Sequence, residues 1–185
     1  PMENFIGVWW SGSENDVIPA GDAAHGYKSL ALHASGDNFP LYDDIKKHVV
    51  GKGLAAGDGS NVGTVLYSRG MYAAILAVEG ARTAQEIHGV KDITPSMMRD
   101  GLEALDISES KLASLGLAGF APTFKATCEN HGGTGSAAVQ QWDAKKGTWS
   151  FITDYMTSDQ SVIQPLIDAD SAQFAAENNI KERCN

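Results

Sequence analysis

A long apolar helix pattern constrains the fold of this chain more than any other feature of its sequence. The pattern begins after Thr64, a typical helix N-cap, and runs to about His88-Gly89, where glycine is a typical stop signal. Many alanines accompany its larger apolar residues, which are Val65, Leu66, Met71, Tyr72, Ile75, Leu76 and Val78. Because these residues lie nearly all round the helix, we expect other elements to cover it.

Composition and charge narrow the class of protein. The chain has 185 residues, 43% hydrophobic and 20% charged, which is enough to bury a core. The formal net charge of -9 argues against the clustered basic residues that nucleic acids require, so we expect no nucleic-acid partner. The longest apolar run, Met71 to Val78, is far shorter than the ~20 residues that span a bilayer.

Two apolar segments near the start of the chain are typical of buried strands. Phe5 to Trp10 ends in aromatic residues and is followed by the polar turn Ser11-Gly12-Ser13. Gly26 to Ala34 is a second strand candidate that stops at a polar turn. Since the end of a buried strand is a typical ligand edge in α/β folds, we expect a site after Trp10.

The remaining pattern predicts further helices, a hairpin and a closing helix. Helices are expected over Pro40 to Val50, from Thr94-Pro95 onward and over Ser108 to Leu115, with Gly119 to Lys125 extended. Ala137 to Asp143 and Thr148 to Met156 form the clearest hairpin, in which Trp142 and Trp149 pair across the strands. The last helix begins at Asp159 or Pro165, ends near Asn178, and is expected to face inward with Leu166, Ile167, Ala169, Phe174 and Ala175. Together these elements predict an α/β fold with an antiparallel appendage.

Seven residues are candidates for binding a small molecule. Adjacent residues of a strand point to opposite faces, so one of Trp9 and Trp10 is expected to form an apolar ligand wall while the other packs in the core. Polar anchors for the ligand are expected from Ser11, Ser13 and Glu14. Tyr67 and Arg69 open the long helix, where a cation is badly placed for the helix dipole and is expected to face a cleft or a partner.

The cysteines and the first residue leave alternatives open. Cys128 and Cys184 form either one disulfide that closes a loop of 55 intervening residues or two free thiols. Cys128 and His131 also have the spacing of metal ligands, although a structural zinc site needs four. An N-terminal proline such as Pro1 can act as a general base, so a self-contained small enzyme that uses Pro1 or the Cys128/His131 loop is the competing interpretation.

Three segments in this order resemble a known family. They are FIGVWWSGSENDVIPAGDAAHGY, TVLYSRGMYAAILAVEGARTAQE and ATCENHGG, followed by QQWD and a late cysteine. The set is similar to the C-terminal half of type I periplasmic solute-binding proteins of ABC transporters, the branched-chain amino-acid receptor family. The resemblance covers nearly the whole chain.

The resemblance implies a two-lobed, Venus-flytrap α/β fold. Residues 1–30 would belong to the second lobe, residues 31–122 to the first lobe, and residues 123–185 would complete the second lobe with the hairpin and the last helix. Cys128 and Cys184 would be bridged in the periplasm, and the cleft would be lined by Trp9 to Glu14. The family's first half is not among these residues, so we expect either that half or self-association to cover the exposed apolar surface.

The implied function is solute capture for import. Two lobes of such a receptor close around a solute and present the closed shape to a membrane permease, which requires no catalysis and no cofactor. The aromatic cleft wall predicts a small hydrophobic or aromatic amino acid or an organic acid as the solute.

Overall fold

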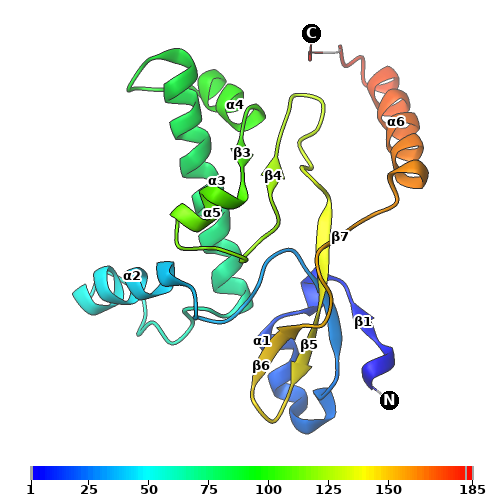
Figure 1. Ribbon diagram of the computed structural model, residues 1–185. Helices are drawn as coiled ribbons and strands as arrows, with labels where there is room; N and C mark the ends of the chain where they lie inside the picture. The colour runs from blue at the N-terminus through cyan, green and yellow to red at the C-terminus, as the bar shows by residue number, and fades with distance from the viewer. Residues whose placement is uncertain (1, 182, 185) are drawn as a thin grey trace.

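The structure is a computed structural model that describes residues 2–181, 183 and 184, apart from the side chain of Trp9. Figure 1 shows a twisted sheet with short helices at the bottom, a group of helices at the upper left, and a separate helix, α6, at the upper right. The sheet and the helical group are joined by the segments that follow β2 and β4. Mixed α/β structure was the predicted class, and it is confirmed.

The main sheet has the strand order β1 (Ile6–Gly7), β2 (Lys28–Ala31), β5 (Ser136–Asp143) and β6 (Thr148–Phe151). The first pair is parallel and the others are antiparallel, while β7 (Met156–Thr157) also pairs with β5. The predicted hairpin is confirmed, and Trp142 is the cross-strand partner of Trp149, with their ring centroids 5.3 Å apart. The second strand is interrupted after Phe151, where Thr153 Oγ1 accepts a hydrogen bond from the Val139 N–H.

The helical group contains α2 (Pro40–His48), α3 (Val65–His88), α4 (Pro95–Glu103) and α5 (Glu109–Ser114). All four were predicted, and two of the expected end signals are present. Thr94 Oγ1 accepts from the Met97 N–H at the start of α4, and Gly89 ends α3 with φ +63°. α3 and α4 cross closely at two glycines, because a Cβ on Gly101 would lie 2.2 Å from the Gly80 carbonyl oxygen.

Short elements complete the chain. The two-stranded ladder of β3 (Asp106–Ile107) and β4 (Phe124–Lys125) was not predicted, and only the end of the expected extended segment Gly119 to Lys125 belongs to it. α1 spans Glu14–Val17. Four 3-10 turns lie at η1 (Met2–Asn4), η2 (Trp9–Ser11), η3 (Ile18–Ala24) and η4 (Val50–Lys52).

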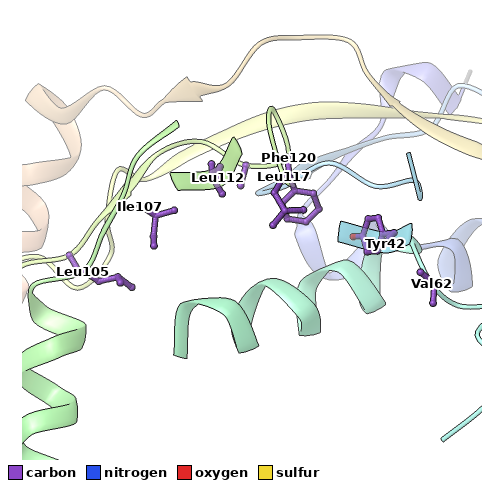
Figure 2. Close-up of a cluster of buried hydrophobic side chains, with 9 residues drawn as sticks. Tyr42, Val62, Leu105, Ile107, Leu112, Leu117 and Phe120 are labelled. Atoms are coloured by element: carbon purple, nitrogen blue, oxygen red, sulfur yellow. The ribbon is translucent and has the colours of Figure 1, made fainter. Parts of the chain in front are cut away.

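Two separate hydrophobic clusters hold these elements. The larger cluster lies in the helical group (Figure 2) and contains Tyr42, Val62, Leu105, Ile107, Leu112, Leu117, Phe120, Ala121 and Ala126. The smaller one lies at the β5–β6 hairpin and contains Val17, Ala24, Val65, Trp142 and Trp149. We call these the helical cluster and the sheet cluster. The first residue of α3 belongs to the sheet cluster, while Tyr72, Ile75 and Leu76 farther along α3 pack against the helical cluster.

The closing helix, α6 (Gln160–Glu177), has the predicted bounds but not the predicted burial. Leu166 is 61% exposed, Phe174 is 60% exposed, and α6 has no buried residue. The expectation of an inward-facing helix was therefore wrong, since within the described part of the chain the apolar side chains of α6 are not buried. The apolar surface of α3 is also only partly covered, with Val78 exposed.

A buried carboxylate joins α3 to α5. Glu79 is 4% exposed and its carboxylate contacts Lys111 Nζ at 2.5 Å and Arg82 Nη1 at 2.6 Å. Burial pushes the pKa of Glu79 upward, but hydrogen bonds and charges from Lys111 and Arg82 outweigh it and hold the pKa below the ordinary 4.5.

This arrangement predicts how acid acts on the protein. Because the pKa of folded Glu79 is lowered, its stabilising contribution is present above the ordinary value and is lost as the pH falls through the folded value. We therefore expect the free energy of unfolding of Glu79→Gln to fall less than that of the wild type between about pH 6 and about pH 3. Urea denaturation across that range measures the difference. An equal pH dependence of the two proteins would contradict this role of Glu79.

Candidate functional site

The candidate site lies where the loop after β1 meets the first turns of α3. Trp10 is 74% exposed, and the Arg69 guanidinium carbon lies 5.6 Å from the centroid of its indole ring. This distance is within the range of a cation–π contact. The structure therefore brings together two of the residues predicted to bind a ligand, although they are 59 positions apart in the sequence.

The conformation of this loop differs from the prediction. Strand β1 ends at Gly7, and Trp9 and Trp10 lie in the 3-10 turn η2. The expected strand therefore stops short of the two tryptophans, and the rule that adjacent strand residues point to opposite faces does not apply to them. The turn is closed by Ser11, whose N–H and hydroxyl both donate to the Val8 carbonyl, at 2.8 and 2.9 Å. The side chain of Trp9 lies outside the described part of the structure.

A buried glutamine fixes the loop to the sheet. Gln140 on β5 is 1% exposed, and its amide nitrogen donates to the Gly12 carbonyl at 2.8 Å and to Ser29 Oγ at 3.0 Å. The approach is so close that a Cβ on Gly12 would lie 2.1 Å from Ser29 Oγ. Glycine is therefore required at position 12, and the loop is held in one position above β2 and β5.

The predicted polar anchors make contacts within the chain. Ser11 Oγ accepts a hydrogen bond from the Tyr27 hydroxyl at 3.1 Å. Ser13 is 5% exposed, and its N–H and hydroxyl donate to Asp16 Oδ2 at 2.8 and 2.6 Å. Glu14 Oε2 accepts the backbone N–H of Val65 at 3.0 Å. These side chains thus shape the loop and fasten it to α3.

Tyr67 lies apart from Trp10 and Arg69. Its ring centroid is 6.4 Å from that of Tyr42, and it lines a groove between α2 and α3 together with Leu41, Ile45 and Met71. Residues two positions apart on a helix do not share a face, so Tyr67 and Arg69 point in different directions. Proximity along the chain therefore does not bring these two predicted site residues together.

Arg69 also lines a cavity of about 260 Å³ beside the two connecting segments. Its other lining residues include Leu32, His33, Tyr72, Phe124 and Thr134. Burial lowers the pKa of Arg69, and the negative charge of Asp16 opposes this change. The cavity combines apolar walls with one cation, which suits a small molecule that has an apolar body and an acidic group.

His33 and Asp16 belong to this region and were missed by the sequence reasoning. The His33 ring stacks on Phe120 at 5.1 Å, and its Nδ1 donates to the Ala34 carbonyl at 2.9 Å. Burial lowers the pKa of His33, the hydrogen bond to Ala34 raises it, and the charge of Arg69 lowers it further, so the pKa lies below its ordinary 6.5. The available signals were the position of His33 near the end of a predicted strand and that of Asp16 just after the predicted anchors.

The second half of the chain carries a disulfide between Cys128 and Cys184, whose Cα atoms are 5.5 Å apart. The predicted bridge is confirmed, and it occupies the sulfur that a nucleophile or a zinc ligand would need. His131 Nε2 instead lies 3.2 Å from Glu103 Oε1, and Arg183 also contacts Glu103. Among the described residues, no group of three or more His, Cys, Asp or Glu side chains is arranged to hold a metal ion. Pro1 lies outside the described residues.

Comparison with solved structures gives two extensive matches. The chain is similar to a protein from the Pseudomonas fluorescens group described as an ABC transporter permease, with a TM-score of 0.91 and 36% identity over 100% of this chain and 45% of that chain. It is also similar to a branched-chain amino acid ABC transporter from Thermus thermophilus with bound valine, with a TM-score of 0.64 and 23% identity over 86% of this chain and 41% of that chain. No protein-family model and no curated protein matches the sequence.

These comparisons show what fold the chain has. It has the fold of part of an ABC transporter protein, and it spans less than half the length of either neighbour. Both neighbours are described as proteins of ABC transporters. In the part of the chain that the structure describes, no helix has the length and apolarity needed to cross a bilayer.

Proposed function

We propose that this chain is the C-terminal half of an extracytoplasmic solute-binding protein of an ABC importer. The full protein captures a small hydrophobic or aromatic amino acid, or an organic acid, between two lobes and delivers it to a membrane permease. It acts in the periplasm and performs no catalysis. The observation that carries this proposal is the similarity of the whole chain to an ABC transporter protein, together with the valine bound to the second neighbour.

The arrangement of the core supports a division into lobes. The sheet cluster and the helical cluster are separate, and two connecting segments join the elements around them. We assign residues 1–30 and 123–185 to the second lobe and residues 31–122 to the first, with β4 at the start of the later segment still paired to β3 of the first lobe. The two lobes then meet at the site, where Trp10 of the second lobe contacts Arg69 of the first.

The exposed apolar surface supports the proposal that another half of the protein packs against this chain. Ile6 of β1 and its neighbours Phe5 and Val8 are each more than 60% exposed, and so is Leu166 of α6. Surfaces of this kind rarely stay bare in soluble proteins. We propose that the N-terminal half of the receptor covers them, and that the present residues would self-associate without it.

Thermal denaturation of the full-length receptor with a panel of solutes tests this function. The panel contains valine, leucine, phenylalanine, benzoate and 3-phenylpropionate, and a sugar and arginine serve as controls. A solute at a hundred times its dissociation constant stabilises the folded state by about 2.7 kcal/mol. We expect at least one panel member, and neither control, to raise the unfolding midpoint. No shift with any panel member would contradict the proposed solute class.

A further inference from the structure

We infer that Glu14 is a positioning residue, which fastens the first turn of α3 and so sets where Arg69 meets Trp10. The sequence alone had suggested that Glu14 touches the ligand. Any effect of Glu14 on solute binding depends on the proposed function of this site. The attachment of α3 by Glu14 does not, because it follows from contacts within the chain.

The start of α3 is capped from a distant part of the sequence. The first N–H groups of a helix lack acceptors within the helix, and an N-cap side chain usually supplies one. Thr64 occupies the N-cap position but makes no such bond, and its hydroxyl instead donates to the Asn61 carbonyl at 2.8 Å. Glu14 Oε2 accepts the Val65 N–H instead. Its negative charge also lies at the positive end of the dipole of a 24-residue helix.

The side chain of Val65 strengthens the same attachment. Val65 is 3% exposed and packs in the sheet cluster with Val17, Trp142 and Trp149, whereas later residues of α3 pack against the helical cluster. The first residue of α3 is therefore held to the sheet side of the molecule by its backbone and by its side chain.

Because α3 is a helix, fixing the position of Val65 also fixes the position of Arg69. Arg69 lies four residues after Val65, which places both on one face of α3 one turn apart. Trp10 lies four residues before Glu14, on the loop that Gln140 holds to the sheet. Both members of the Trp10–Arg69 pair therefore belong to the two segments that the Glu14–Val65 bond joins. Releasing that bond should let the guanidinium move away from the indole.

The test uses the full-length protein without any solute. Two quantities are measured, the amide hydrogen exchange of residues 65–69 and the indole N–H resonance of Trp10, which Trp10→Phe assigns. Glu14→Ala should speed exchange there by roughly 2- to 30-fold, the range expected for loss of a helix cap, and should shift the Trp10 resonance. Glu14→Gln retains an acceptor and should stay close to the wild type. Glu109→Ala is the matched control, since Glu109 is also the first residue of a helix but is exposed.

A second variant removes the donor of the Glu14–Val65 hydrogen bond instead of its acceptor. Val65→Pro removes the donated N–H at the first helical position, where proline is tolerated, and Thr64 already has the extended conformation that a following proline requires. It should shift the Trp10 resonance as Glu14→Ala does, and it replaces Glu14→Ala if that variant does not fold.

The outcomes separate this inference from the proposed function. Exchange within two-fold of the wild type and an unmoved Trp10 resonance in the Glu14 and Val65 variants would overturn the positioning role. Loss of solute affinity in Glu14→Ala with both quantities unchanged would also overturn it, because Glu14 would then contact the solute. If the predicted changes occur but no solute binds the wild type, the positioning role stands and the proposed function fails.

Discussion

Removing the disulfide with Cys128→Ser and Cys184→Ser together should destabilise the protein by about 4 kcal/mol. The bond joins residues 56 positions apart, so its loss releases a long loop in the unfolded chain and raises the entropy of that state. The folded state keeps other contacts near the chain end, including the ion pair of Arg183 with Glu103. We therefore expect the variant to fold with a lower midpoint of urea denaturation.

The wild type measured with and without a thiol reductant is the control for this prediction. Reduction should lower the free energy of unfolding of the wild type by a similar amount and should not change the double variant. A difference between wild type and variant below about 1 kcal/mol would contradict the entropic role assigned to the bond.

Phe120→Ala should destabilise the protein by roughly 3–5 kcal/mol, the range for truncating a buried aromatic side chain. Phe120 is fully buried in the helical cluster (Figure 2). Its ring lies 5.2 Å from that of Phe39 and 5.6 Å from that of Tyr72, in addition to the stack on His33. These neighbours come from a connecting segment, the start of α2, and α3. The substitution would leave a cavity where all three meet.

Phe120→Leu is the matched variant, because it retains much of the volume and should cost less than half as much. Urea denaturation of both variants measures the difference. If Phe120→Ala and Phe120→Leu lower the free energy of unfolding equally, the aromatic contacts, and not the filled volume, dominate the stabilisation at this position. A loss below about 1 kcal/mol for Phe120→Ala would contradict the central place of Phe120 in the helical cluster.

The helix ends and the hairpin could be predicted from residues that are neighbours in the sequence. The cap at Thr94, the glycine that ends α3 and the hairpin with its paired tryptophans were all identifiable, because each depends on residues close together along the chain. The ladder of β3 and β4 was missed because each strand has two residues, which is too short to show a periodicity.

The site was predicted only in part, because some of its contacts join residues far apart in the sequence. An aromatic segment followed by polar residues indicated a ligand edge, but the hydrogen bonds of Ser11 turn the chain at Trp9 and Trp10. The role of Glu14 depends on Val65, which is 51 positions away, and no local pattern indicates such a contact. The exposure of α6 is a related case, since its apolar residues predict burial but do not identify the surface that covers them.

Calorimetric titration of the full-length receptor, with the panel solute that stabilises it, tests the central claim most directly. We predict that Trp10→Ala and Arg69→Ala each weaken binding roughly 10-fold or more, because they remove the aromatic wall and the cation of the site. Leu54→Ala, which truncates a side chain that is 72% exposed, should leave the affinity unchanged. Binding by both site variants within two-fold of the wild type would contradict the assignment of the solute site to the contact between the β1 loop and α3.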